Sequence, residues 1–171
     1  WAKPIYIELS AFYLNRKMVF KYTVGIIGGC GHVGLPLALS FAKKGLKVVA
    51  IDSNKESVDR VMNKQMPFFE PNAELILKEV VGNGNFYCTN EQNNVSQAEH
   101  IIIVPGTPVD FDFIPDLTQI EMVVKSILQY LQPNHVLIFR STLAPKSTDY
   151  IKNFIEINTK FTIGVDLFIS F

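Results

Sequence analysis

The sequence predicts an α/β protein in which a doubly wound parallel sheet carries helices on both of its faces. From Tyr22 onward, short runs rich in Val and Ile alternate with segments of helical periodicity. A glycine-rich string joins the first of these runs to the first helical segment. The length of 171 residues suits one domain with a sizeable core. Strands that alternate with helices pair in parallel, because each helix returns the chain to the same end of the sheet.

The composition excludes several classes of protein. Lys plus Arg and Asp plus Glu both number 16, so the chain lacks the positive excess of a nucleic-acid-binding protein. Charged residues such as Glu8 and Arg16 interrupt the apolar start, so no run reaches the roughly 18 to 20 residues of a membrane span. Two cysteines, Cys30 and Cys88, form no disulfide framework, which favours a reducing, cytoplasmic compartment. Neither has the neighbours that a metal site needs.

The first two predicted elements are a strand over residues 22–27 and a helix over residues 32–44. Gly45 can take the left-handed conformation that ends a helix, and the lysines before it suit the negative end of the helix dipole. This helix should bury four apolar side chains against the sheet: Val33, Leu37, Ala38 and Phe41.

A second buried strand is predicted over residues 47–51, followed by a helix through about residue 64. Ser53 and Glu56 have the spacing of a capping box at the start of that helix. The elements expected next are a helix over 72–81, a short strand over 86–88 and a strand over 100–104.

The last third contains the most regular helical pattern of the chain. Asp116 is the predicted cap of this helix and Pro133 ends it. Its apolar stripe consists of Leu117, Ile120, Val124, Ile127, Leu128 and Leu131. The remaining expected elements are a strand over 136–139, a helix capped by Ser147 that runs to about 157, and a strand over 165–171.

The string from Gly29 to Gly34 has the form G-x-G-x-x-G, leaves a predicted strand and opens a predicted helix. In that context the glycines permit a tight turn and the close approach of a pyrophosphate. The positive end of the helix and its free N–H groups stabilise that anion. These features together predict a Rossmann-like, dinucleotide-binding domain. The alternatives are a glycine-rich turn without a ligand and an FAD protein, since FAD proteins share the fingerprint.

Asp52 follows Gly34 by 18 positions (52 minus 34), at the end of the second predicted strand. A carboxylate there accepts hydrogen bonds from the ribose hydroxyls of adenosine and repels a 2′-phosphate. We therefore expect NAD rather than NADP, with Lys55 as the nearby charge that weakens this preference.

Three histidines and one cysteine lie beside predicted elements without the partners that catalysis requires. His32 occupies a free fingerprint position and is expected to have a structural role. His100 and His135 flank strands, and we expect them to be capping or surface residues, because no Ser, Cys or carboxylate is arranged to activate them. Cys30 occupies another variable position and is expected to be a small packing residue, although a helix N-terminus would lower its pKa.

Several polar side chains follow other predicted strands. Thr107, Ser141 and Thr142 come after strands whose carboxyl ends lie at the same edge as the glycine loop, where open α/β sheets bind ligands. They could face the nicotinamide, or they could only satisfy backbone groups in turns. Glu70 lies between two prolines and could contact a ligand or cap a helix.

Four separate motifs, in order, resemble those of the UDP-glucose/GDP-mannose dehydrogenase family. The resemblance covers about residues 19–171 and includes the fingerprint, Pro67-Phe68-Phe69-Glu70-Pro71, Gly106-Thr107-Pro108-Val109-Asp110 and Arg140-Ser141-Thr142-Leu143-Ala144-Pro145. The Gly-His-Val-Gly and Gly-Thr-Pro-Val-Asp strings are most similar to the branch that contains UDP-N-acetylmannosamine dehydrogenase.

The resemblance implies an enzyme that oxidises C6 of a nucleotide sugar from alcohol to acid in two NAD-dependent steps, through an intermediate held on a cysteine. Glu70 would belong to a substrate or cofactor loop, and Thr142 would support catalysis beside C6. The implied cofactor-binding residues are Gly29, Cys30, Gly31, His32, Val33, Gly34, Asp52, Val104, Gly106, Thr107, Ser141 and Thr142.

The sequence also departs from the family pattern. The family's Pro-Glu motif, its catalytic lysine, asparagine and cysteine, its dimer-forming helix and its UDP-binding domain lie beyond the position that matches Phe171. We therefore expect a fragment of a longer product, or a decayed copy, with an extension over residues 1–17, a domain over 18–171 and no turnover alone. A UDP-sugar would bind only to the full-length protein. Two alternatives stay open: a non-catalytic NAD-binding module, and a different dehydrogenase of the hydroxyacid type.

Overall fold

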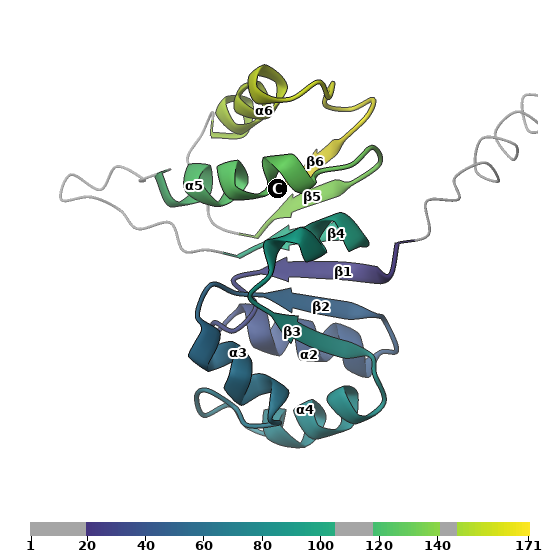
Figure 1. Ribbon diagram of the computed structural model, residues 1–171, viewed down its shortest axis with the longest axis vertical. Coiled ribbons are helices and arrows are strands. Elements are labelled where there is room, and N and C mark those ends of the chain that lie inside the picture. Colours follow the sequence, from purple (N-terminus) through teal and green to yellow (C-terminus); the bar gives the residue numbers. More distant parts are fainter. Residues whose placement is uncertain (1–19, 105–117, 141–146) are drawn as a thin grey trace, which may run out of the picture.

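The computed structural model describes residues 20–104, 118–140 and 147–171. Within these ranges six strands form one parallel sheet in the order β3-β2-β1-β4-β5-β6 (Figure 1). This arrangement confirms the predicted doubly wound fold. The strands are β1 (Tyr22–Ile27), β2 (Val48–Ile51), β3 (Phe86–Thr89), β4 (Ala98–Ile103), β5 (Val136–Phe139) and β6 (Phe168–Ser170).

Helices cover both faces of the sheet, as a parallel sheet requires. One face carries α2 (Gly34–Lys43), α3 (Lys55–Met62) and α4 (Ala73–Gly82). The other carries the 3₁₀ helix η1 (Gln92–Gln97), α5 (Thr118–Ile127), the 3₁₀ helix η2 (Leu128–Tyr130) and α6 (Ser147–Asn158) (Figure 1). None of the helices in the described ranges is long and apolar enough to span a lipid bilayer.

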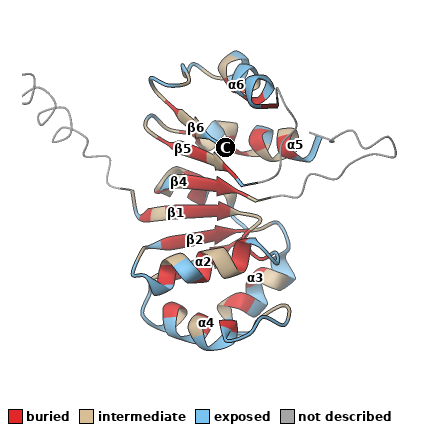
Figure 2. Cartoon of the chain, turned by 180° about the vertical axis from the view of Figure 1, so that it is seen from behind, coloured by how far each residue is buried: buried red, intermediate tan, exposed pale blue. Residues whose placement is uncertain are grey.

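Each central strand supplies side chains to two cores. Along β2, Val48 and Ala50 pack beneath α2 and α4, whereas Val49 and Ile51 pack on the opposite side. All four are buried, and Figure 2 shows the central strands as almost continuously buried. Successive residues of a strand point to opposite faces, so a strand covered on both sides reads as an unbroken apolar run.

The carboxyl ends of the central strands lie at one edge of the sheet. Ile27 at the end of β1 pairs with Ile51 of β2 and with Ile103 of β4. Ile103 pairs in turn with Phe139 at the end of β5. The order of strands reverses between β1 and β4, and an open α/β sheet binds ligands at that reversal. This register brings the segments that follow these strands together.

The buried face of α2 differs from the prediction. Val33 precedes the helix and is 48% exposed, and Leu37 and Phe41 are half-buried. Of the expected core residues only Ala38 is fully buried, together with Leu35, Leu39 and Ala42. The rotation of the helix is set at Gly34, whose backbone packs against Gly28, so Leu35 and not Val33 turns toward the sheet.

Local signals predicted several element ends correctly and missed others. Gly45 has φ +90° after α2, as expected. The cap of α3 is Asn54 rather than Ser53, because the Asn54 side chain accepts a 3.0 Å hydrogen bond from the Ser57 amide. The 3₁₀ helix η1 was not predicted, and β6 spans fewer residues than expected. The predicted cap Asp116, and Leu117 beside it, lie outside the described residues.

His135, which was expected to be a capping or surface residue, is buried. Its exposed fraction is 0%, and its ring lies 5.2 Å from that of Phe20. Nδ1 accepts a hydrogen bond from the Gln132 amide at 3.1 Å, whereas Nε2 has no partner among the described residues. Burial lowers the pKa of His135 from its usual value near 6.5 to about 4.

This burial predicts an acid-dependent loss of stability. Between pH 6.5 and pH 4, His135 is protonated in the unfolded chain but neutral in the folded protein. The unfolding free energy therefore has its full value above this window and falls within it as the pH decreases. On going from about pH 7.5 to about pH 5, the wild type should lose about 2 kcal/mol more unfolding free energy than His135→Gln. Urea denaturation at both pH values measures this difference, and equal losses would contradict it.

Candidate functional site

The loop between β1 and α2 forms a tight turn at the carboxyl edge of the sheet. Gly28 has φ +78°, a conformation that a side chain disfavours. The Gly31 amide donates to the Gly28 carbonyl at 3.2 Å and closes the turn. The amides of Gly28 and Gly29 both donate to the carbonyl of Ile51 at the end of β2. The loop is therefore fixed to the sheet on the side that faces Asp52.

The three fingerprint glycines have different physical reasons to lack a side chain. A Cβ on Gly29 would lie 2.7 Å from Cβ of Ala50, and one on Gly34 would lie 2.2 Å from the Gly28 carbonyl oxygen. Both glycines are thus required by packing of the loop on β2 and of α2 on the loop. A Cβ on Gly31 would meet only the Gly28 oxygen, at 3.4 Å. Packing of the fold therefore does not require a glycine at position 31, and the space above this residue is open to a ligand.

The amino end of α2 has the properties of an anion site. Its N-cap residue, Val33, makes no side-chain capping bond. Among the described residues, none accepts a hydrogen bond from the amides of His32 or Val33. Free amides at the positive end of a ten-residue helix attract a phosphate group.

Asp52 faces this loop, as the sequence predicted. It follows β2, is half-buried, and its Oδ2 accepts a hydrogen bond from the Cys30 amide at 2.9 Å. Its Oδ1 accepts from the Asn54 amide at 3.0 Å. The two amides hold the carboxylate beside the glycine loop, where an adenosine ribose would reach it.

His32 joins the glycine loop to the segment over residues 67–71. Its ring stacks on that of Phe68, with centroids 4.1 Å apart and planes 19° from parallel. Sequence reasoning assigned His32 a structural role without finding this partner. Glu70 in the same segment is exposed and lines an open hollow of about 680 Å³ beside Arg60 and Lys78, and no residue of the glycine loop lines that hollow.

Cys30 packs in the core beneath α2, in agreement with the expectation of a small packing residue. The helix begins four positions later, at Gly34, so Cys30 does not lie at its first turn. Its Sγ lies 3.4 Å from Sγ of Cys88 on β3. Sequence reasoning missed this pair, although the pairing of β3 beside β2 would have indicated it.

The remaining predicted positions divide between described and undescribed residues. The Val104 amide donates to Ile27 at 3.1 Å, which holds the segment after β4 beside the end of β1. His100 is a strand residue whose Nδ1 bonds to the Thr23 carbonyl at 3.2 Å. Within the described ranges no three His, Cys, Asp or Glu side chains gather as a metal site would require. Outside those ranges lie Gly106, Thr107, Ser141 and Thr142.

A family model described as the UDP-glucose/GDP-mannose dehydrogenase family, NAD binding domain, matches residues 22–170. The chain belongs to this family. The match confirms the resemblance, which rested on the fingerprint and on the Glu70, Gly106 and Arg140 motifs. NAD is the cofactor of this dehydrogenase domain.

Similar proteins include UDP-N-acetyl-D-mannosamine dehydrogenases. The enzyme of Pyrococcus horikoshii is 28% identical over 142 residues, which are 83% of this chain and 34% of the relative. That of Escherichia coli K12 is 31% identical over 127 residues, which are 74% of this chain and 29% of the relative. The chain thus spans about a third of the length of these relatives.

Solved structures agree with the fold. A ternary complex of GDP-mannose dehydrogenase from Pseudomonas aeruginosa superposes with a TM-score of 0.80 at 25% identity, covering 86% of this chain and 35% of that one. The UDP-N-acetylmannosamine dehydrogenase of Pyrococcus horikoshii gives 0.79 at 27% identity, covering 85% and 34%.

The described residues fit an NAD molecule. The space above Gly31 and the free amides at the amino end of α2 suit a pyrophosphate, and the Asp52 carboxylate suits a ribose that carries free hydroxyls.

The contact at Gly34 predicts a strong effect of one methyl group. Gly34→Ala should lower the unfolding free energy by about 2 to 4 kcal/mol, because the new Cβ collides with the Gly28 carbonyl and must displace α2. Gly82→Ala is the matched control, since no atom lies within 4 Å of its added Cβ at the end of α4. It should be neutral or stabilising by up to about 1 kcal/mol. Chemical denaturation compares the two, and equal stabilities would overturn the packing role of Gly34.

Proposed function

We propose that this chain is the NAD-binding part of a nucleotide-sugar 6-dehydrogenase, which converts the C6 alcohol of a UDP-sugar to an acid with two NAD. One observation carries the dinucleotide site: the Asp52 carboxylate faces a glycine loop whose next amides, those of His32 and Val33, have no acceptor among the described residues. Membership of the dehydrogenase family supports the reaction class.

In this proposal each part of the loop has a separate task. The His32 and Val33 amides bind the pyrophosphate, and Gly31 leaves room for it. Gly29 and Gly34 hold the loop against β2 and α2, and Cys30 presents its amide to Asp52. The segments after β4 and β5, with Val104, Gly106, Thr107, Ser141 and Thr142, would surround the nicotinamide, which accepts the hydride when NAD is bound.

Charge at Asp52 supports selection of NAD over NADP. One carboxylate oxygen accepts a hydrogen bond from the loop amide of Cys30 and the other accepts one from the Asn54 amide. Rotation of the Asp52 side chain away from the loop would break both hydrogen bonds. A 2′-phosphate on the adenosine ribose would place its negative charge against that carboxylate. Lys55, at the start of α3, is exposed and therefore offsets little of this repulsion.

We infer that residues which this chain does not supply complete the sugar site. Hydride transfer requires the sugar C6 within near-attack distance of the nicotinamide. The 171 residues span about a third of the similar dehydrogenases, so we infer that they bind the dinucleotide without turnover. The UDP-N-acetyl-D-mannosamine enzymes among the relatives favour a UDP-N-acetylhexosamine as the substrate of the whole protein.

Calorimetry with NAD and NADP tests this proposal. The wild-type chain should bind NAD at least about ten-fold more tightly than NADP, because like charges oppose the 2′-phosphate. Asp52→Asn keeps one acceptor oxygen for the Cys30 amide but removes the charge and the second oxygen, which accepts from the Asn54 amide, so it should weaken NAD binding and reduce the preference to within about three-fold. Equal affinities in the folded wild-type protein, or no binding at all, would refute the assignment.

Gly31→Ala separates the binding role of the loop from its folding role. The added Cβ meets one atom at an ordinary contact distance, so the unfolding free energy should change by less than about 0.5 kcal/mol. The same methyl group occupies the space above the loop, so NAD affinity should fall by at least about ten-fold. A variant that is stable and binds NAD normally would show that the pyrophosphate lies elsewhere.

A further inference from the structure

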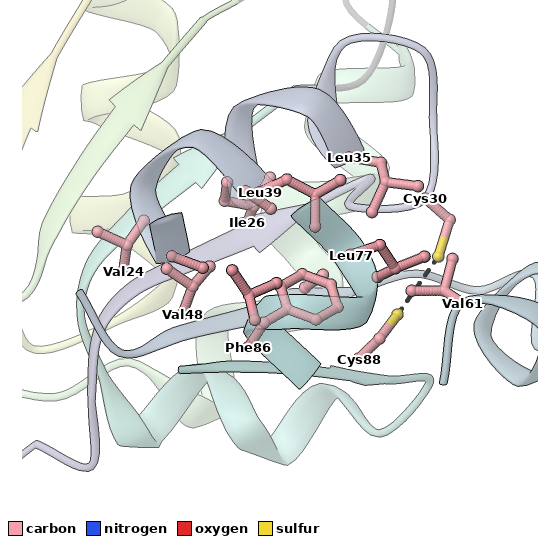
Figure 3. Packing of buried hydrophobic residues seen from close by; sticks show 14 of the residues in the cluster. Val24, Ile26, Cys30, Leu35, Leu39, Val48, Val61, Leu77, Phe86 and Cys88 are labelled. Atoms are coloured by element: carbon pink, nitrogen blue, oxygen red, sulfur yellow. Dashed lines mark hydrogen bonds between the residues drawn. The ribbon is translucent and has the colours of Figure 1, made fainter. Parts of the chain in front are cut away.

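Cys30 and Cys88 form a pair of thiols directly beneath the dinucleotide loop. Their sulfurs lie 3.4 Å apart although the residues are 58 positions apart in the chain (Figure 3). Both are free cysteines, with exposed fractions of 6% and 2%. Apolar side chains from α2, α3 and α4 surround them: Leu35, Val61 and Leu77.

The sheet holds Cys88 and places Cys30 beside it. Cys88 pairs with Ala50 of β2 in the parallel ladder, and its amide donates to Sδ of Met62 at 3.2 Å. Gly29, which precedes Cys30, packs against the same Ala50. The two cysteines therefore lie beside one residue of β2, and only a short movement separates their sulfurs from bonding distance.

We propose that Cys30 and Cys88 form a reversible disulfide that switches the dinucleotide loop between a binding and a weakly binding form. The covalent step rests on the sulfur geometry, whereas its effect on NAD rests on the proposed function. A disulfide requires the sulfurs to close from 3.4 Å to about 2.05 Å, a movement of about 1.4 Å.

The oxidant class that suits this pair is a small hydroperoxide, because the thiols are too buried for a bulky disulfide reagent. Cys30 lies next to the exposed Gly31, so its thiolate attacks the peroxide oxygen and becomes a sulfenic acid as the O–O bond breaks. Cys88 then attacks that sulfur, and water leaves with the sulfenic oxygen. In total, two thiols and one hydroperoxide give one disulfide, one water and one alcohol, or a second water from hydrogen peroxide.

The environment of Cys88 suits the second step rather than the first. Its contact with Cys30, together with burial, raises the pKa of the Cys88 thiol. Cys88 thus stays protonated while Cys30 reacts, and in the second step its proton passes to the sulfenic oxygen as the S–S bond forms and water leaves. A dithiol reductant reverses the bond by thiol exchange.

The movement that closes the bond should occur in the loop. Cys88 is held by the β2–β3 ladder, whereas Cys30 belongs to a segment outside the ladder. A shift of Cys30 moves the amide that binds Asp52 and the adjoining Gly31, which together line the proposed NAD site. Oxidation should therefore weaken NAD binding while it cross-links the chain over 58 positions and stabilises the fold.

The test uses the reduced 171-residue chain treated with one equivalent of hydrogen peroxide, then denatured and alkylated. We expect an intact mass lower by two hydrogen atoms, no alkylation, and a digest in which the peptides of Cys30 and Cys88 are linked. The melting temperature should rise by roughly 5 to 10 °C, and dithiothreitol should restore the reduced values. Two alkylated thiols, or a sulfinic acid without a link, would overturn the proposal.

Calorimetry before and after oxidation measures the effect on binding. NAD affinity should fall by about ten-fold on oxidation and recover on reduction. In the Cys88→Ser variant, peroxide should produce neither a cross-link nor the rise in melting temperature. If that variant does not fold, Cys88→Ala serves as the control, with the same expected result. An unchanged NAD affinity in the cross-linked protein would refute the switch. If the reduced chain did not bind NAD, the proposed function would be contradicted. The disulfide itself would still be tested by the intact mass and the melting temperature.

Discussion

The close contact between the start of α2 and the end of β1 is the constraint on which the site depends. The Gly34 backbone packs against the Gly28 carbonyl at a distance that no side chain permits. This contact fixes the rotation of α2, which turns Leu35 into the core and leaves Val33 exposed. It also aims the free amides of the helix start at the carboxyl edge of the sheet. Fold and anion site thus share one cause.

The two-sided sheet gives that contact its rigidity. Because β1 and β2 are covered on both faces, their ends cannot move apart without exposing apolar surface. The loop amides bond to Ile51 and to the Asp52 carboxylate, so the end of β2 holds the loop from one side. On the other side, above Gly31, the described residues leave open space. A rigid support with one open side is the arrangement that a bound dinucleotide requires.

Several features were predictable because their causes are local. The Val- and Ile-rich runs predicted the strands, since a two-sided strand must be apolar throughout. The G-x-G-x-x-G string and Asp52 predicted the loop and its carboxylate, because a short turn from β1 and the end of the adjacent β2 leave little freedom in their placement. The family followed from the same residues together with the Glu70 and Arg140 motifs.

By itself, the sequence determined the class of fold, the order of its strands and the placement of the glycine loop beside Asp52, because these depend on residues that are neighbours in the chain or on adjacent strands. Only the tertiary structure decided the rotation of α2, the burial of His135 and the contact between Cys30 and Cys88. The cysteine contact and the burial of His135 depend on how distant segments pack, and the rotation of α2 depends on the close contact between Gly34 and Gly28. Hydrophobic periodicity predicts that a face of a helix or strand is buried, but it does not predict which element packs on that face or how close two side chains lie.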